Sequence, residues 1–141
     1  MADLYVMAID QGTTSTRCII FDRCGKPVES SQMEHEQITN EKGWVEHDPM
    51  EIMENTKKVM RQALEKLNTS DDSPRIASIG ITNQRETTII WDKKTGKPIY
   101  NAIVWQDPRT DGICRSYAGT KGRDRFRHIT GLPLYPYFSG E

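Results

Sequence analysis

The chain has 141 residues, the length of one compact domain and less than an enzyme with a cleft between two domains usually needs. Hydrophobic residues make up 35% and charged residues 28%, so we expect a folded domain with a small core rather than a disordered chain. The 19 Lys and Arg balance 20 Asp and Glu to a net charge of −1, which excludes a chain-wide attraction to nucleic acid or to an anionic membrane surface.

The N-terminus and the cysteines favour a soluble cytoplasmic protein. Residues 1–5 include an acid and lack the apolar stretch of a signal peptide, and no apolar run approaches the roughly 20 residues of a membrane span. Cys18, Cys24 and Cys114 are odd in number and lack the CxxC spacing of metal sites. Reduced thiols are therefore expected rather than a disulfide framework.

Residues 4–34 predict three strands joined by short turns. Residues 4–9 form a nearly continuous apolar run, typical of a buried strand, and a polar turn at 12–15 follows it. A second strand is predicted over 16–22 and a third over 27–34. Strands connected by such tight turns form an antiparallel meander.

The clearest helix start lies at Asp48. Asp48 is suited to cap the helix, Pro49 to occupy its first position and Glu51 to close a capping box. Apolar or small residues then recur at helical spacing, which predicts that one face packs on the sheet. These residues are Ile52, Met53, Thr56, Val59, Met60, Ala63, Leu64 and Leu67.

The alternating pattern over 76–82 predicts another strand. After it, residues 87–92 are expected to turn at 93–97 towards a further extended run over 99–104.

The character of the chain changes at Gln106, beyond which prolines are frequent and only a weak helical stretch near 109–117 is visible. We expect a core over 1–105 and an irregular extension of the same domain over 106–141. The chain stops without a terminating element, which favours a truncated protein.

The turn after the first strand has the composition of a phosphate-binding hairpin. Gly12 lets an anion approach the backbone, and the hydroxyls of Thr13, Thr14 and Ser15 add donors. Asp10, at the strand end, is suited to hold the waters of a magnesium ion. An ordinary polar hairpin turn has the same composition, so the residues alone leave both interpretations open. A Walker loop is excluded because its GxxxxGK[ST] pattern does not occur.

The hairpin and several later segments together resemble the FGGY carbohydrate kinases. The matching segments are 10–17, 43–49, 79–87, 101–110, 131–132 and 136–140. They follow in family order over nearly the whole chain. The resemblance implies an α/β domain of the actin-like ATPase, ribonuclease H-like class, whose mixed sheet begins with the antiparallel meander. It also implies that a second domain, with the catalytic base and the adenine pocket, lies beyond residue 141, so the chain alone is expected to be inactive.

The resemblance implies a substrate turn at 83–87 that binds glycerol. By resemblance Arg85, Glu86 and Tyr137 contact the hydroxyls, and Trp105 forms an apolar wall against the carbon chain. Such groups suit a triol, which needs donors and acceptors in a fixed array beside an apolar surface. Without the resemblance, Arg85 and Glu86 fit a surface ion pair, and both aromatic residues fit ordinary packing.

The resemblance also implies MgATP as the second substrate. The residues that it assigns to the phosphates of ATP are Thr13, Thr14, Ser15 and Arg17. It assigns Asp10 to Mg²⁺, through water. Phosphoryl transfer depends on positioning and charge neutralisation, and these are suitable groups. It assigns no role to 107–110, where Asp107 is expected to cap the following helix.

The function implied by the resemblance is ATP-dependent phosphorylation of glycerol to glycerol 3-phosphate, the first step of glycerol catabolism. The full-length protein is expected to be a homo-oligomer, with no nucleic acid or membrane partner. Three alternatives remain: a kinase for another small polyol or sugar, a ribonuclease H-like nuclease, and a non-catalytic remnant that binds or regulates. The nuclease requires further carboxylates beside Asp10 to hold two metals.

Overall fold

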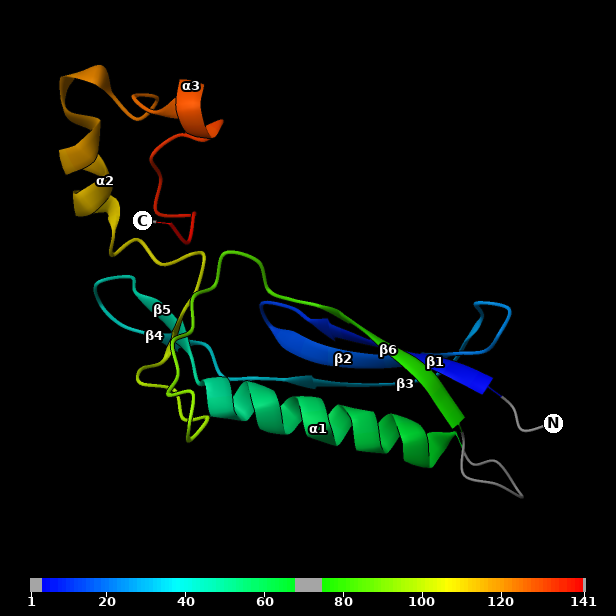
Figure 1. Ribbon diagram of the computed structural model, residues 1–141. Helices are drawn as coiled ribbons and strands as arrows, with labels where there is room; N and C mark the ends of the chain where they lie inside the picture. Colours follow the sequence, from blue (N-terminus) through cyan, green and yellow to red (C-terminus); the bar gives the residue numbers. More distant parts are fainter. Residues whose placement is uncertain (1–3, 68–74, 141) are drawn as a thin grey trace. The chain divides into compact units, whose positions relative to one another are not determined.

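The computed structural model describes residues 4–67 and 75–140, which form two compact units (Figure 1). Unit 1 comprises Met1–Glu36 and Pro49–Gln84, and unit 2 comprises Gln37–Asp48 and Arg85–Glu141. Within the described part of the chain, no helix is long and apolar enough to cross a membrane.

Unit 1 is built on a four-stranded sheet in the order β3-β2-β1-β6. The strands are β1 (Leu4–Gln11), β2 (Ser15–Phe21), β3 (Pro27–Glu34) and β6 (Arg75–Thr82). β1, β2 and β3 pair antiparallel, whereas β6 pairs parallel with β1. The predicted meander and the strand predicted over 76–82 are therefore confirmed, and the sheet is mixed.

The core of unit 1 lies on one face of this sheet. Met7 is paired with Ile20, and Ile9 with Cys18, and all four side chains are buried. Because successive residues of a strand point to opposite faces, their neighbours Asp10 and Arg17 lie on the other face. The register therefore separates the apolar core from the polar residues of the hairpin.

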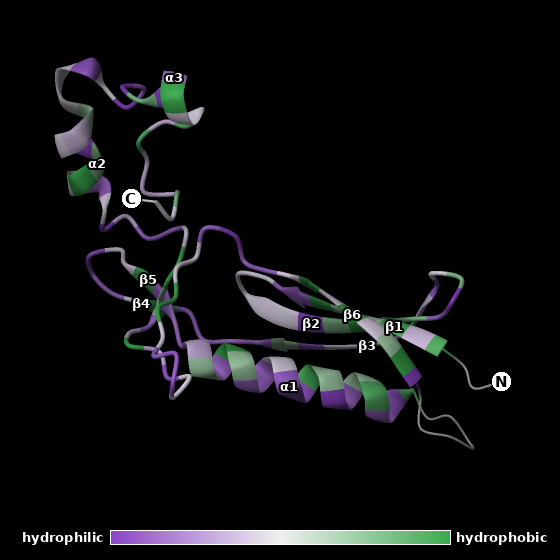
Figure 2. Cartoon of the chain, viewed as in Figure 1, coloured by the Kyte–Doolittle hydropathy of each residue, from purple (hydrophilic) through white to green (hydrophobic). Residues whose placement is uncertain are grey.

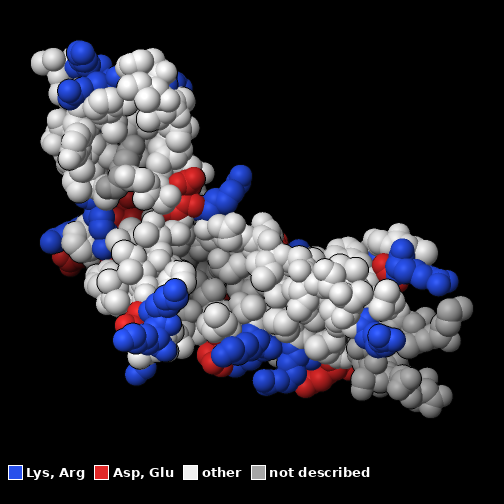
Figure 3. Space-filling model, in the orientation of Figure 1, with Lys and Arg blue, Asp and Glu red and all other residues white. Residues whose placement is uncertain are grey.

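Helix α1 (Pro49–Lys66) covers the core face over β2 and β3. Figure 2 shows hydrophobic and hydrophilic residues alternating along it, and Figure 3 shows charged side chains of both signs on its exposed side. Val59 and Ala63 are completely buried against the sheet. Met53 is 50% exposed, so the prediction that it faces the core is wrong.

Glu51 accepts hydrogen bonds from the Glu36 N–H through its two carboxylate oxygens, at 3.2 and 3.1 Å.

We predict that Val59→Ala lowers the free energy of unfolding of unit 1 by about 2 kcal/mol, because it leaves a cavity that the sheet cannot collapse to fill. Far-ultraviolet circular dichroism during urea unfolding follows α1, the longest described helix. Met53→Ala is the matched control on the same helix and should cost less than about 0.5 kcal/mol. Equal losses at the two positions would contradict the assignment of the buried face.

Unit 2 contains a small sheet in the order β4-β5-β7, with β4 (Ile38–Thr39), β5 (Val45–His47) and β7 (Ala102–Ile103). The chain then forms α2 (Asp111–Ala118), a 3-10 turn η1 (Gly119–Lys121) and α3 (Arg127–Thr130). The helix predicted near 109–117 is confirmed.

The extended pair predicted over 87–104 in unit 2 forms only in part. Apart from β7, the described structure has isolated bridges between Thr88 and Ile103 and between Trp91 and Pro98. The bridge at Pro98 is held by its neighbours, because the Asp92 N–H donates to the Lys97 carbonyl at 2.8 Å and the Ile99 N–H donates to the Ile90 carbonyl at 3.0 Å.

Candidate functional site

The hairpin between β1 and β2 turns tightly at Gly12. The Gly12 N–H donates to the Ser15 carbonyl at 2.9 Å. A Cβ at position 12 would lie 3.3 Å from that same oxygen, tighter than ordinary contact, so glycine allows this close approach. Glycine at this position therefore permits the tight turn between the two strands.

Gln11 ties this turn to the end of β6. Its Nε2 donates to the Gly12 carbonyl at 2.7 Å, and its Oε1 accepts the Gln84 N–H at 3.3 Å. The Thr14 carbonyl accepts the His35 N–H at 3.2 Å. The hairpin is thus held from two sides, by Gln84 in the segment after β6 and by His35, the residue that follows β3.

Asp10 and Arg17, both predicted site residues, are neighbours across β1 and β2. They are register partners on the sheet face opposite α1, and both are exposed. Gln32 is the register partner of Arg17 on β3, so it continues the row. A carboxylate and a guanidinium next to each other on an open sheet face are available to a metal-bound polyanion. The structure thus brings together Asp10, predicted for Mg²⁺, and Arg17, one of the residues predicted for the phosphates.

Glu86 has an unusual backbone conformation. Its φ is 63°, the only positive φ of a non-glycine residue in the described part of the chain. Such a conformation costs of order 1–3 kcal/mol for a non-glycine residue, and it is found where surrounding contacts enforce it, often at functional sites. The side chain of Glu86 is contacted by Ser139, whose N–H and Oγ donate to Glu86 Oε2 at 2.9 and 3.0 Å.

The same contacts determine the charge of Glu86. The Ser139 N–H and then the Ser139 hydroxyl stabilise the carboxylate, and nearby Arg85 adds to this, so the pKa of Glu86 is lowered from its ordinary value. Among the described residues both hydrogen bonds go to Oε2, which leaves Oε1 as an acceptor for a ligand hydroxyl. Arg85 is exposed beside it.

Trp105 and Tyr137 form an edge-to-face pair with ring centroids 5.5 Å apart, and Tyr137 makes a second such pair with Phe138 at 5.1 Å. Tyr137 and Ser139 lie on one loop, so this loop carries a partner for Trp105 and a partner for Glu86. We call Glu86, Trp105, Tyr137 and Ser139 the Glu86 cluster. Three of its four members were predicted from the sequence.

An open cavity of about 700 Å³ in unit 2 is lined in part by Trp105 and Tyr137. Glu86 is not one of its lining residues, so we do not assign this cavity to the alcohol.

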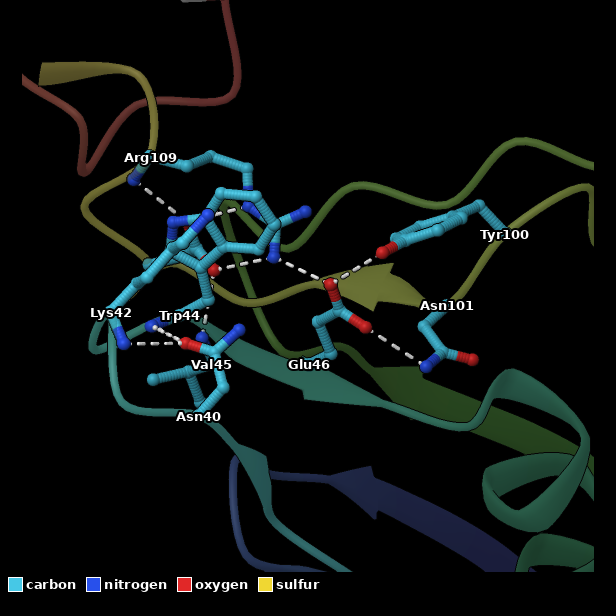
Figure 4. A network of polar contacts seen from close by, with 9 residues as sticks. Asn40, Lys42, Trp44, Val45, Glu46, Tyr100, Asn101 and Arg109 are labelled. Carbon is cyan, nitrogen blue, oxygen red and sulfur yellow. Dashed lines mark hydrogen bonds and ion pairs between the residues drawn. The ribbon is translucent and has the colours of Figure 1, made fainter. Parts of the chain in front are cut away.

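A buried ion network lies two residues beyond Trp105 (Figure 4). Arg109 Nη2 donates to Glu46 Oε1 at 2.6 Å and to Asp107 Oδ2 at 2.8 Å, and Arg109 Nε donates to Asp107 Oδ1 at 2.8 Å. The Val45 N–H donates to Asp107 Oδ2 at 2.7 Å, which ties this segment to β5. The guanidinium of Arg109 also stacks 4.2 Å from the ring centre of Trp44.

This network corrects the expectation for Asp107. Helix α2 begins with Thr110 at its N-cap, which makes no side-chain cap bond, and Asp107 lies before it. Asp107 is only 3% exposed and instead accepts the N–H groups of Val45 and Arg109. It fixes the segment that follows Trp105 and does not cap the helix.

Both carboxylates of the network are charged in spite of their burial. Burial raises the pKa of Glu46, but hydrogen bonds from Arg109, Asn101 and Tyr100 outweigh it, and the pKa lies below its ordinary value. For Asp107, burial is likewise outweighed by bonds from Arg109 and from the Val45 N–H. The pKa of Arg109 is raised, first by its bonds to Asp107.

These shifts predict that acid destabilises unit 2. Carboxylates whose folded pKa is depressed contribute stability above their unfolded pKa, about 4.3 for Glu and 3.9 for Asp, and the stability is lost as pH falls through the folded pKa. The three tryptophans lie in unit 2, so tryptophan fluorescence follows this unit. We expect the urea midpoint to be constant above about pH 6 and to fall below about pH 4.

Arg109→Met is the control for this pH dependence, since without the guanidinium the two carboxylates are no longer held charged. The acid-induced fall should be smaller in this variant. A fall of equal size in both proteins would exclude the network as its cause.

The predicted residues fall into two groups. Asp10, the hydroxyl-bearing turn and Arg17 belong to unit 1, and Arg85 with the Glu86 cluster belongs to unit 2. Sequence reasoning missed Ser139, Gln32 and the Glu46–Arg109 pair. Ser139 lies in the segment 136–140, and the resemblance of this segment to the family was the one signal that could have indicated Ser139.

The sequence pattern of the FGGY family of carbohydrate kinases, N-terminal domain, matches residues 5–141. A glycerol kinase of Roseiflexus sp. is 58% identical over 136 residues, and a glycerol kinase of Chloroflexus aurantiacus is 59% identical over 138 residues. Each match covers 96% of this chain and 27% of the relative. The chain therefore spans about a quarter of the length of these relatives.

Solved structures agree with this assignment. The crystal structure of Plasmodium falciparum glycerol kinase with ADP matches with a TM-score of 0.90 and 40% identity, over 98% of this chain and 27% of that one. Gluconate kinase from Lactobacillus acidophilus matches with a TM-score of 0.84 at 24% identity, over 96% of this chain and 26% of that one. At this identity the match shows a shared fold alone. The prediction of a mixed α/β domain of the actin-like ATPase class is confirmed.

Proposed function

The chain belongs to the FGGY family of carbohydrate kinases, and from this premise we propose that it forms the N-terminal part of a glycerol kinase. The reaction transfers the γ-phosphoryl group of ATP to a terminal hydroxyl of glycerol and yields glycerol 3-phosphate. High identity to two glycerol kinases supports the choice of substrate.

The observation that carries this proposal is the conformation of Glu86. A left-handed glutamate held by two hydrogen bonds from Ser139 presents a charged acceptor with its second oxygen available. The aromatic pair of Trp105 and Tyr137, on the segment and loop described above, adds apolar surface and a phenol. An alcohol with several hydroxyls on a short carbon chain matches such groups, because each hydroxyl needs an acceptor and the C–H faces need an apolar wall.

The hairpin at 10–17 suits the triphosphate. Thr13, Thr14 and Ser15 offer hydroxyls, and Arg17 offers a cation on the open face of the sheet. Asp10 is a single exposed carboxylate, which fits Mg²⁺ because this ion keeps most of its waters and is bound through few protein ligands. When bound, Mg²⁺ supplies charge neutralisation on the phosphate oxygens.

We assign the general base and the adenine pocket to a second domain outside residues 1–141, and expect a cytoplasmic homo-oligomer with no nucleic acid or membrane partner. In this proposal residues 1–105 and the extension 106–141 serve one kinase domain. General-base catalysis contributes about 10²- to 10⁴-fold, so the 141-residue chain by itself should not turn over at a useful rate. A coupled assay on the purified chain tests this.

A chimera tests the proposed function. Residues 1–141 replace the matching quarter of the Roseiflexus glycerol kinase, and phosphorylation of glycerol, erythritol and a pentulose is compared. We expect glycerol to be the preferred substrate, with kcat/KM near that of the parent kinase. A folded chimera that prefers erythritol or the pentulose would identify another polyol or sugar kinase. A folded chimera that phosphorylates none of the three would refute the proposal.

A further inference from the structure

We infer that Gln32 is a positioning residue of the phosphate hairpin, which holds Arg17 and Ser15 in the orientation that receives an anionic phosphate chain. The inference rests on the proposed function, because it deepens the role of the hairpin at 10–17. Gln32 has no role in the resemblance and lies on β3, outside the hairpin itself.

One amide group engages both residues. Gln32 Oε1 accepts from Arg17 Nε at 2.9 Å and from Arg17 Nη2 at 2.7 Å, and Gln32 Nε2 donates to Ser15 Oγ at 2.8 Å. The acceptor and the donor of the amide thus bind two different predicted phosphate residues.

The sheet register places Gln32, Arg17 and Asp10 next to one another. Gln32 lies opposite Arg17, and Arg17 lies opposite Asp10, so the three form one row across β3, β2 and β1. Neighbouring strands are about 4.8 Å apart, which places Gln32 two strands, or about 10 Å, from Asp10. All three lie on the face that α1 does not cover, because the buried residues Cys18 and Ser31 point the other way.

The neutrality of Gln32 is the feature that favours an anion. A carboxylate at this position would hold Arg17 equally well but would neutralise its charge. Arg109 shows that arrangement: it is fixed by Asp107 and Glu46 and serves as a structural cation. Arg17 is fixed by an uncharged acceptor through Nε and Nη2, so Gln32 adds no negative charge beside the guanidinium and leaves its Nη1 donors for a ligand.

The bond to Ser15 acts in the same direction. Because Ser15 Oγ accepts from Gln32 Nε2, its own O–H is left to donate elsewhere. A hydroxyl used as a donor is what a phosphate oxygen requires. Gln32 thereby prepares one charged and one neutral donor before the ligand arrives, and preorganisation of this kind raises affinity by reducing the entropy lost on binding.

The test titrates inorganic tripolyphosphate into the 141-residue chain and follows the Arg17 Nε–H resonance by NMR. Gln32→Met keeps the length of the side chain and removes its hydrogen bonds. We expect Gln32→Met to weaken the binding of tripolyphosphate about 3- to 10-fold, because the long side chain of Arg17 must then be ordered when the ligand binds. Ser30→Ala, two residues earlier on the same face of β3, is the matched control and should leave the Kd unchanged.

Gln32→Glu distinguishes the orientation of Arg17 from the effect of a negative charge at position 32. It should keep the Arg17 resonance as ordered as in the unmodified chain and still weaken binding, because the added carboxylate competes with the anion. In an Arg17→Met background, Gln32→Met should have a smaller effect than in the unmodified chain, since part of its action passes through Arg17. Urea unfolding of each variant checks that unit 1 remains folded.

Each outcome decides the inference. Binding that weakens in Gln32→Met and Gln32→Glu but not in Ser30→Ala supports it. Binding by the unmodified chain that Gln32→Met does not change overturns it and leaves the proposed function intact. No binding by the unmodified chain overturns the phosphate role of the hairpin and the inference together. In the chimera, Gln32→Met should raise KM for MgATP about 3- to 10-fold and leave KM for glycerol unchanged.

Discussion

Replacement of Arg109 by Met should lower the free energy of unfolding of unit 2 by about 3 kcal/mol. The guanidinium neutralises Asp107 and Glu46, which are 3% and 8% exposed, and its removal leaves two buried carboxylates close together. The loss comes mainly from that uncompensated charge and not from the intrinsic strength of the ion pairs, because a buried pair gains little over the hydration of its separated partners.

Urea unfolding followed by tryptophan fluorescence measures this loss, since Trp44, Trp91 and Trp105 all belong to unit 2. Arg115→Met is the matched control: its guanidinium is 76% exposed and pairs with Asp111 on the surface, so its loss should cost less than about 1 kcal/mol. Arg109→Lys keeps the positive charge but not the planar guanidinium, so its loss of unfolding free energy should lie between those of Arg109→Met and Arg115→Met. Similar losses for Arg109→Met and Arg115→Met would show that the network is screened like a surface pair.

The network links stability to the proposed substrate contacts. Asp107 is two residues from Trp105, and it is fixed by Arg109 and by the Val45 N–H. The segment that carries the predicted apolar wall is therefore anchored to β5. We expect Arg109→Met to impair glycerol binding in the chimera through this anchor, although Arg109 itself is not proposed to contact the alcohol.

The elements of unit 1 could be predicted because each is determined by local sequence. The apolar run at 4–9 and the tight turns determine the meander, and Asp48 with Pro49 marks the start of α1. The exposure of Met53 could not be predicted, because α1 lies over β2 and β3 and the apolar stripe of the helix is wider than the surface that it covers.

The contacts that complete the candidate sites are long-range and left no local signal. Glu46 and Arg109 are 63 positions apart, and Glu86 and Ser139 are 53 apart. Each pair depends on how loops of unit 2 fold together, which neither composition nor periodicity encodes. The resemblance implied roles for Arg85, Glu86, Trp105 and Tyr137, but not the left-handed backbone at Glu86 or the hydrogen bonds that its carboxylate accepts from Ser139.

Replacement of Glu86 by Ala in the chimera should lower kcat/KM for glycerol by about 10- to 200-fold, because a hydrogen bond to a charged partner is worth about 1.5 to 3 kcal/mol. The carboxylate is the acceptor that Ser139 has already oriented, and its lowered pKa keeps it charged at neutral pH. The same variant should leave KM for MgATP nearly unchanged, since in our proposal the nucleotide phosphates are bound by the hairpin at 10–17.

Backbone strain, a second variant and the stability of unit 2 distinguish a role in substrate binding from a role in folding at this position. Alanine carries a Cβ as glutamate does, so a positive φ at position 86 should be about equally unfavourable in Glu86→Ala and in the parent. Ser139→Ala removes the hydroxyl bond but keeps the N–H bond to Oε2, and should lower kcat/KM by a smaller factor than Glu86→Ala. Full activity in Glu86→Ala would remove Glu86 from the substrate contacts. If Glu86→Ala lowers the free energy of unfolding of unit 2 as well as kcat/KM, the strained glutamate has a structural role. A residue that only binds substrate would lower kcat/KM and leave that free energy unchanged.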